Sequence, residues 1–312
     1  MSYGSGVPGF REQLLGVTGN AIVRAKPDST YADGDDASWM EVDWQALSRP
    51  VEVAGKPMNV IDTGGDGPPL LLIHGLGGVW QNWLLTIPAF MGSFRVVAPD
   101  LPGFGGSEMP VGRISIQGYA RVVDELCSAL GIEAPVVVGN SMGGFIGLRL
   151  AARRPDLLTS VLVMGTSADV EEQAEAMDAL IAAVAEHGME PVIDGVLYFM
   201  MGDTTLNDPS RAEVLAGVRE LLLSRTPEYA DAAWHIAHRP AILDELPNIT
   251  IPLTVVAGTE DHTYPPPKSE QIVAGVPHAR LISMERTGHV HALENPEAVN
   301  AVLEEHLAAL TT

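Results

Sequence analysis

A serine set between glycines is the first residue whose type and spacing point to chemistry. Residues 139–143 read G-N-S-M-G with Ser141 at the centre, and they stand between the apolar run Val136–Val138 and a helical pattern. A serine on a tight turn from a buried strand into a helix projects its hydroxyl from the edge of a sheet, and flanking glycines let neighbouring backbone come close. This setting predicts that Ser141 is a nucleophile, whereas the short pattern alone often occurs by chance.

A serine nucleophile needs a base and an acid, which follow it in the order Asp or Glu, then His. His289 lies on a loop before the last helical pattern, where a neutral imidazole takes the serine proton and returns it to the leaving group. Asp261 follows the strand pattern Leu253–Ala257, at the end of the strand where wound sheets place their sites. We expect Asp261 to orient the imidazole, in preference to its neighbour Glu260 and to Asp169 after the preceding strand.

The segment at residues 74–78, H-G-L-G-G, follows another strand pattern and is predicted to form an oxyanion hole. The backbone N–H groups of Leu76 and Met142 are the expected donors. Losing one such donor typically costs about 10²–10³ in rate. His74 is expected to support this loop by hydrogen bonding, and His291 is expected to line the site rather than to act as its base.

Two other residues that could do chemistry, an aspartate and a cysteine, are expected to have structural roles. Asp100 begins the turn D-L-P-G-F-G-G-S, where its carboxylate is expected to accept hydrogen bonds from backbone amides. Cys127 is the single cysteine and lies at helical spacing among apolar residues, which favours a small buried hydrophobe. No histidine and carboxylate grouping has the spacing of a metal site, so neither a metal nor an organic cofactor is expected.

Alternating strand and helix patterns are predicted to position these residues. Such alternation indicates an α/β fold with a mostly parallel wound sheet flanked by helices. The strand patterns are Val51–Val53, Met58–Asp62, Leu70–Ile73, Val96–Ala98, Val136–Val138, Val161–Val163, Leu253–Ala257 and Arg280–Ser283. The helical patterns are Ser115–Leu130, Gly143–Arg153, Pro267–Val273 and Pro296–Leu310.

One interval is too long to be a simple connection. Residues 169–246 are mainly helical in pattern and are predicted to form an inserted cap, while residues 47–168 and 247–312 form the core and 1–46 an N-terminal extension. The apolar cap residues expected to line a substrate pocket are Tyr198, Phe199, Met200 and Trp234. Periodicity leaves open which of them face the pocket, because the segment around them is uniformly apolar.

Charge and hydropathy narrow the classes of partner. The 312 residues include 40 acidic and 18 basic side chains, a formal charge of −22, which disfavours nucleic acid and anionic membranes as partners. The first residues lack the pattern of a signal peptide, and no apolar run is long enough to span a bilayer. With one cysteine excluding an intrachain disulfide, a cytoplasmic protein is expected. The composition leaves the oligomeric state open.

Five segments together resemble the α/β-hydrolase superfamily, in its capped branch of esterases, lipases and C–C hydrolases. They are residues 74–78, 100–107, 139–144, 258–266 and 287–296, and the likeness extends from Pro50 to Leu310. The resemblance implies an α/β-hydrolase fold, the triad Ser141, Asp261 and His289, the oxyanion donors Leu76 and Met142, and a lid over the site. Haloalkane dehalogenases and epoxide hydrolases of this superfamily carry aspartate where this chain has serine, so those activities are not expected.

Two hydrolase activities stay open, together with a function without catalysis. The apolar, Met-rich cap favours a carboxylesterase acting on small or medium acyl substrates, similar to monoacylglycerol lipases. A C–C hydrolase of meta-cleavage products is the alternative, with Arg219 gripping a substrate carboxylate. That class usually carries Gly-Pro-Gly-Ala after the His-Gly pair and tryptophan after the catalytic histidine, where this chain has residues 76–79 (L-G-G-V) and Val290. A ligand receptor with this fold is the third hypothesis.

Overall fold

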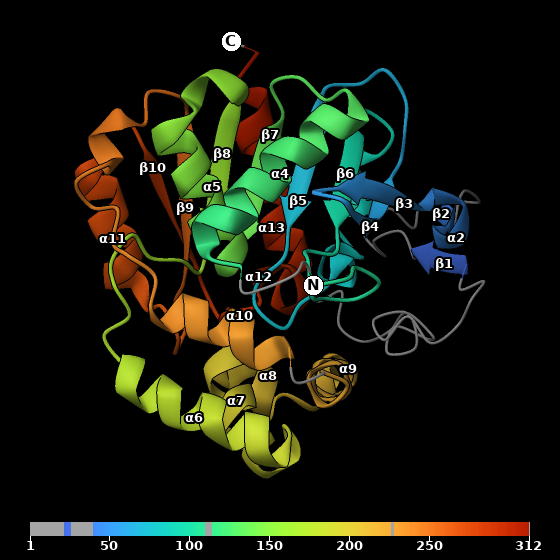
Figure 1. The fold of residues 1–312 in the computed structure, drawn as a ribbon. Coiled ribbons are helices and arrows are strands. Elements are labelled where there is room, and N and C mark those ends of the chain that lie inside the picture. The colour runs from blue at the N-terminus through green and yellow to red at the C-terminus, as the bar shows by residue number, and fades with distance from the viewer. Residues whose placement is uncertain (1–21, 26–39, 110–113, 226–227, 312) are drawn as a thin grey trace.

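The central element of the molecule is an eight-stranded, mostly parallel sheet (Figure 1). The computed structural model describes residues 22–25, 40–109, 114–225 and 228–311. The strand order is β10-β9-β8-β7-β5-β6-β4-β3, and only β4 pairs in the antiparallel sense, with β3 and β6. The strands are β3 Ser48–Val53, β4 Lys56–Asp62, β5 Pro69–Ile73, β6 Arg95–Pro99, β7 Val136–Asn140, β8 Ser160–Met164, β9 Leu253–Gly258 and β10 Arg280–Met284. The predicted α/β fold is confirmed, and every predicted strand is present.

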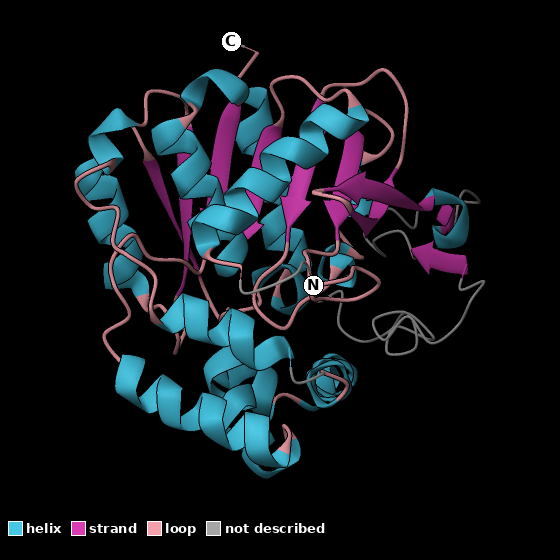
Figure 2. Cartoon of the chain, in the orientation of Figure 1, coloured by secondary structure: helices cyan, strands magenta, loops and turns pink. Residues whose placement is uncertain are grey.

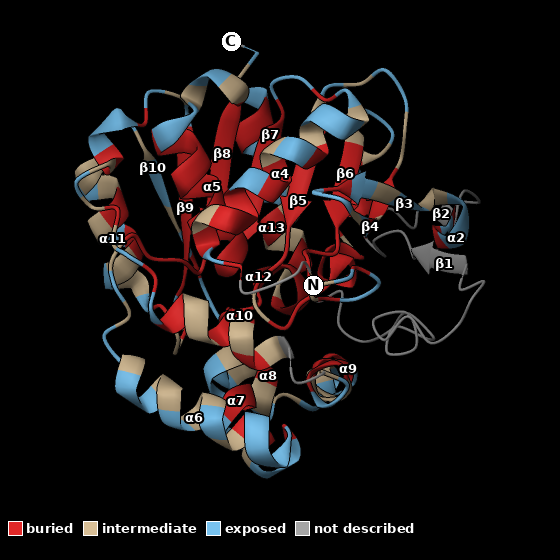
Figure 3. Cartoon of the chain, viewed as in Figure 1, coloured by how far each residue is buried: buried red, intermediate tan, exposed pale blue. Residues whose placement is uncertain are grey.

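The apolar runs form strands that are buried on both faces. Along β7, Val137 packs in one core cluster and Val136 and Val138 in the other, because successive side chains point to opposite faces of a strand. Figure 3 shows the central strands buried along their length. Continuous apolar runs are the expected pattern for parallel strands with helices on both sides.

Helices cover both faces of this sheet (Figure 2). The first core cluster includes residues of α4 Ile116–Leu130, α5 Met142–Arg153 and α11 Pro266–Gly275. The second includes residues of α3 Ile87–Phe90, α12 His291–Glu294 and α13 Pro296–Ala308. Ser115 caps α4 by accepting the Gly118 N–H at 3.1 Å, and Gly131 ends it in a left-handed conformation.

The described residues of the interval expected to form a cap fold into five α-helices, with short 3-10 turns at Glu190–Val192 and Pro209–Arg211, and these helices lie beyond the carboxyl ends of the parallel strands (Figure 1). These are α6 Ala174–His187, α7 Ile193–Met200, α8 Asp203–Asn207, α9 Ala212–Leu223 and α10 Glu228–Ala237. Val184, Leu197, Val218 and Leu222 are buried in this region and join the second core cluster. The helices therefore pack against one another and onto the core.

The described part of the N-terminal extension lies beside β3 and β4 (Figure 1). Strand β1 Ile22–Ala25 pairs antiparallel with β2 Met40–Asp43, and the short helix α2 Trp44–Leu47 follows. The rings of Trp44 and Trp80 stand 4.9 Å apart, centroid to centroid, so this segment packs on the core. Residues 1–21 and 26–39 lie outside the described residues.

Among the described residues, no helix has the length and apolarity to cross a membrane, and no cluster of His, Cys, Asp and Glu has the arrangement of a metal site.

Candidate active site

Ser141 stands on a strained turn between β7 and α5. Its φ of 54° and ψ of −113° fall in a region that residues other than glycine rarely adopt, and such strain is often found at functional sites. A Cβ on Gly139 would overlap the Gly143 carbonyl, and one on Gly143 would overlap the Ile73 carbonyl. The two motif glycines are therefore required by close backbone packing, and Ser141 immediately precedes the N-terminus of α5.

The predicted acid and base form a buried pair. His289 Nδ1 lies 3.0 Å from Asp261 Oδ2 and 3.1 Å from Oδ1. Asp261 Oδ1 also accepts the backbone N–H groups of Thr263 and Tyr264 at 2.9 and 2.8 Å. Burial acts to raise the pKa of Asp261, but the charge and hydrogen bond of His289, with smaller contributions from His291 and Tyr264, lower it below its usual range. Asp261 is therefore ionised at neutral pH and holds Nδ1–H, which leaves Nε2 to accept a proton.

Asn140, the residue before Ser141, also holds the loop of His289. Its Nδ2 donates to the carbonyl oxygens of Met164 at 3.1 Å and His289 at 2.9 Å. The His291 ring contacts the same His289 carbonyl through Nδ1 at 3.1 Å, and burial lowers the pKa of His291 to about 4, so the ring is neutral. Sequence reasoning gave Asn140 no role, although a polar residue ending an apolar strand was a visible signal.

The two competitors for the acid lie elsewhere. Glu260 accepts hydrogen bonds from the Thr204 N–H at 2.6 Å and the Thr204 hydroxyl at 2.8 Å, so its carboxylate is directed to the cap. Asp169 accepts the N–H of its neighbour Val170 at 2.8 Å. Of the three carboxylates considered, Asp261 is the one that the structure joins to His289.

The predicted oxyanion loop lies against Ser141. A Cβ on Gly75 would stand 3.0 Å from the Cβ of Ser141, so the loop backbone passes directly beside the serine. Leu76 follows on this loop and is half-buried, while Met142 is the buried first residue of α5. The two backbone segments expected to supply N–H donors thus flank the hydroxyl.

His74 supports this loop as a neutral ring. Its Nε2 accepts the Leu101 N–H at 2.9 Å, so the proton is on Nδ1, which donates to the Gly75 carbonyl at 2.7 Å. Burial, with a smaller contribution from the charge of Arg225, lowers the pKa of His74 to about 4, although the hydrogen bond to the Gly75 carbonyl acts to raise it. Asp100 is equally structural, because it accepts the backbone N–H groups of Trp80 and Gly106.

Cap side chains cover the oxyanion loop. A Cβ on Gly77 would lie 3.0 Å from Leu222 Cδ2 and 3.1 Å from Tyr229 Cε2, which come from α9 and α10. Arg225 lies between these two helices, donates its Nε to the Leu221 carbonyl at 2.9 Å, and interacts electrostatically with Asp100. Burial lowers the pKa of Arg225.

Arg219, the cap arginine singled out from the sequence, instead pairs with Asp194 on the exposed side of the cap. Both residues of this pair come from cap helices. Sequence reasoning missed Arg225, which follows α9 at a position that periodicity does not assign to a face.

The predicted pocket residues occupy different places. Tyr198 and Phe199 on α7 are 49% and 42% exposed, and the Tyr198 ring stacks on His262 at 4.4 Å between centroids. Met200 is half-buried and packs against the second core cluster. Trp234 on α10 is half-buried and stacks on the His238 ring at 4.2 Å. Leu222 and Tyr229, which the sequence analysis did not select, approach the oxyanion loop instead.

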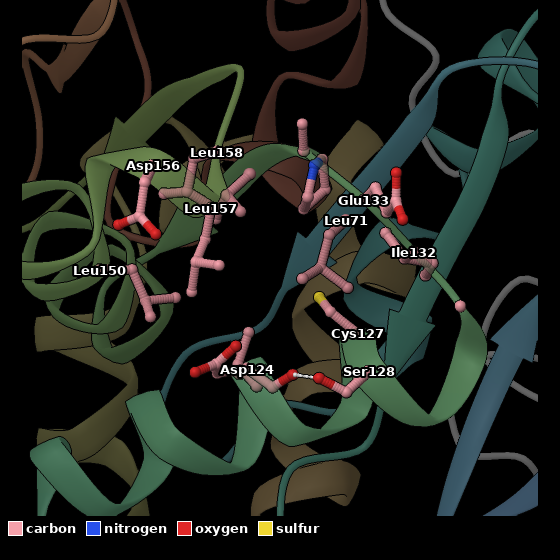
Figure 4. Close-up of a pocket in the computed structure, with 15 residues that line it drawn as sticks. Leu71, Asp124, Cys127, Ser128, Ile132, Glu133, Leu150, Asp156, Leu157 and Leu158 are labelled. Carbon is pink, nitrogen blue, oxygen red and sulfur yellow. Dashed lines mark hydrogen bonds between the residues drawn. The ribbon is translucent and has the colours of Figure 1, made fainter.

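A cavity of about 540 Å³ opens at the opposite end of the strands (Figure 4). It is lined by the amino-terminal ends of β5 and β7, by α4 and by residues after α5, among them Leu71, Cys127, Val137 and Leu158. Burial raises the pKa of Cys127 to about 12, so its sulfur is an unreactive thiol at neutral pH. Ser141 follows the carboxyl end of β7, so this cavity is separate from the candidate site.

Comparisons with a family model, with relatives and with solved structures indicate the same protein family. The model of the alpha/beta hydrolase family matches residues 70–302. The chain is 30% identical over 282 residues to a 2-hydroxymuconate semialdehyde hydrolase of Pseudomonas sp. (strain CF600), covering 84% of this chain and 94% of the relative. Among solved structures, a thermophilic esterase from Thermogutta terrifontis has a TM-score of 0.78 at 27% identity, covering 85% of this chain and 99% of the other. An enol-lactonase from Burkholderia xenovorans LB400 has a TM-score of 0.78 at 25% identity, covering 83% and 100%. The chain therefore belongs to the alpha/beta hydrolase family.

Proposed function

We propose that this protein is a serine hydrolase that cleaves carboxylic ester bonds of small or medium acyl substrates through an acyl-enzyme. The observation that carries the proposal is the buried pair of His289 and Asp261, whose loop is hydrogen-bonded to Asn140, the residue before a serine on a strained strand-to-helix turn. These are the parts that acyl transfer requires: a nucleophile, a base and a group that orients the base.

In the proposed reaction Ser141 Oγ attacks the ester carbonyl while His289 Nε2 takes its proton. The backbone N–H groups of Leu76 and Met142 stabilise the negative oxygen of the tetrahedral intermediate. The imidazolium then protonates the departing alcohol as the carbon–oxygen bond breaks, leaving an acyl group on Ser141. A water molecule, deprotonated by His289, attacks this acyl group and releases the acid.

The electrostatics of the site support this sequence. The lowered pKa of Asp261 keeps the carboxylate charged, so it stabilises the imidazolium that forms in each half-reaction. The N-terminus of α5 directly after Ser141 favours the developing negative charge. The site needs no further charged group for acyl transfer.

The cap supports an apolar acyl or alkyl group in the substrate. Leu222 and Tyr229 lie against Gly77 of the oxyanion loop, so apolar surface covers the position next to the reacting carbonyl. A monoacylglycerol is therefore one substrate to test beside simple esters. The structural likeness to the esterase from Thermogutta terrifontis, which covers 85% of this chain, supports the proposal of ester hydrolysis.

A C–C hydrolase of ring-fission products is the second candidate. It is favoured by the likeness to a 2-hydroxymuconate semialdehyde hydrolase and by Arg225, a cap cation placed near the oxyanion loop. In this case Arg225, rather than Arg219, would hold a substrate carboxylate, since Arg219 is already paired with Asp194.

A turnover panel separates these functions. It contains p-nitrophenyl esters of increasing chain length, a monoacylglycerol and a ring-fission dienoate. Ester hydrolysis with little dienoate cleavage supports the proposal, and the reverse preference, abolished by Arg225→Met, supports the second candidate. If nothing in the panel turns over and an organophosphonate does not label Ser141, a ligand receptor replaces both hydrolase functions.

A further inference from the structure

Glu294 is a buried carboxylate that joins the cap to the loop of the candidate base. It is the last residue of α12 and has no exposed surface. Its Oε1 accepts the N–H of Val290, the residue after His289, at 3.0 Å. Its Oε2 accepts hydrogen bonds from the Gly202 N–H and the Thr205 hydroxyl, both at 2.8 Å. One side chain thus bonds both the histidine loop and the first turn of the cap helix α8.

The backbones on the two sides of this link are in direct contact. A Cβ on Gly202 would lie 2.8 Å from the Gly288 nitrogen, and one on Gly288 would come within 2.7 Å of the Met201 carbonyl carbon and overlap the Gly202 nitrogen. No side chain fits between them. A shift of the cap at Met201 and Gly202 is therefore transmitted to Gly288, which directly precedes His289.

The partners of Glu294 require an oxygen at both carboxyl positions. Each oxygen faces a backbone N–H, which can only donate. A glutamine has one oxygen and one NH₂ group, so in either orientation its NH₂ would face a buried N–H. Leaving a buried donor without an acceptor is costly. Burial also raises the pKa of Glu294, so its carboxyl group is held here against a desolvation cost that an apolar residue would avoid.

Glu260 makes a parallel link that differs in one chemical respect. Its Oε2 accepts the Thr204 N–H, but its Oε1 faces the Thr204 hydroxyl. A hydroxyl donates or accepts, so a glutamine at residue 260 keeps both bonds by donating its NH₂ to the hydroxyl oxygen. The two glutamates therefore form a matched pair: the same substitution breaks one link and preserves the other.

We infer that Glu294 is a positioning residue, whose two oxygens hold the cap segment 202–205 against Val290 and so fix His289 for proton transfer with Ser141. The effect of Glu294 on the reaction rate rests on the proposed function. Its structural consequence, the coupling of the cap to the histidine loop, does not depend on any activity.

The test compares Glu294→Gln with Glu260→Gln in the full chain. In Glu294→Gln we expect kcat for p-nitrophenyl acetate to fall roughly 10- to 100-fold with KM changed less than about twofold, because misplacement of a catalytic group lowers the rate without weakening binding. Amide hydrogen exchange is expected to accelerate in two segments at once, residues 200–206 and 286–291. Glu260→Gln is expected to stay within about twofold of the wild type, and neither segment to change.

Other outcomes overturn the inference. Wild-type kcat in Glu294→Gln contradicts it, as does faster exchange spread evenly over the chain, which would indicate a general loss of stability. If Glu294→Gln does not fold, Thr205→Val removes one bond and keeps both backbone bonds. For this variant we expect kcat to fall about threefold and hydrogen exchange at residues 286–291 to become faster. If neither kcat nor the exchange rate changes, the inference is overturned. If the wild type hydrolyses no ester, the proposed function fails, and the exchange data alone decide the coupling.

Discussion

The edge of the sheet that carries the candidate site and the cap beyond it are built in different ways. At the sheet edge Ser141, Asp261 and His289 are all at most 6% exposed, and Asp261 is bonded on both sides by ring and backbone donors. In the cap, Tyr198 and Phe199 are nearly half exposed and make ring contacts at the surface. From this difference we expect residues at the core edge to determine the reaction of the proposed hydrolase, and residues of the cap to determine its substrate preference.

The largest effect is expected at the core edge, in Ser141→Ala. Removing the nucleophile leaves only the oxyanion donors and binding, so ester turnover should fall by about 10⁴–10⁶. The thermal midpoint should change little, because alanine keeps the backbone of the turn and removes one hydroxyl. Steady-state kinetics with p-nitrophenyl acetate, together with a melting curve, measure both. A rate near that of the wild type would mean that another residue is the nucleophile.

Asp261→Asn is the next largest change at the same edge. Asparagine keeps the shape but stabilises the wrong tautomer of His289, which costs about 10⁴ in kcat in the serine triad. Glu260→Gln, one residue away, is the matched control and should cost no more than about twofold. A larger loss in Glu260→Gln than in Asp261→Asn would reverse the assignment of the acid.

The sheet core should also give the protein a distinct sensitivity to acid. Burial lowers the pKa values of His74, His291 and His306 to about 4, so these rings are neutral in the native state. In the unfolded chain they take up protons near pH 6.5. The unfolded state thus binds more protons between about pH 6.5 and 4, and stability present above this range is lost as the pH falls through it, by about 1.4 kcal/mol per pH unit for each ring.

The raised pKa values of Asp100 and Glu294 act in the opposite direction, so the net slope is smaller than that of three histidines. Urea unfolding at pH 7, 6 and 5 measures it. We expect the free energy of unfolding to decrease towards pH 5, and a constant or rising value would contradict the expectation that the three buried rings outweigh the two carboxyl groups.

The smallest effects are expected in the cap, where they should appear as altered preference. Tyr229→Ala removes apolar surface beside Gly77 and should change the ratio of kcat/KM between short and long acyl esters about tenfold, with little change for the acetate ester. Tyr198→Ala is the control, because its ring lies at the surface against His262, and it should leave the ratio within about twofold. Equal effects of the two substitutions would remove the distinction between the covered and the exposed part of the cap.

Local patterns made the core predictable. A continuous run such as Val136–Val138 forms a strand because both of its faces are covered, and that requirement is visible in the sequence itself. The order of Ser141, Asp261 and His289 along the chain follows from the order of the strands that carry them. The pairing of His289 with Asp261 could be predicted for the same reason, because both residues follow strand ends at one edge of the sheet.

The contacts of the cap were harder to predict from the sequence, because they depend on how its helices are placed on the core. Periodicity in the uniformly apolar α7 does not distinguish a face, so Tyr198 and Phe199 looked like pocket residues and lie half exposed. Arg219 and Arg225 differ by six positions and only the packing separates their surroundings. Glu294 reads as an ordinary helical acid, and its partner Gly202 is 92 residues away.

Covalent labelling of the nucleophile tests the central claim most directly. The wild-type protein is treated with a fluorophosphonate and its intact mass and modified peptide are measured. The account predicts one adduct, on Ser141, none in Ser141→Ala, and much slower labelling in His289→Ala, where no imidazole takes the proton. An adduct on another residue, or an unlabelled protein that still hydrolyses esters, would contradict it.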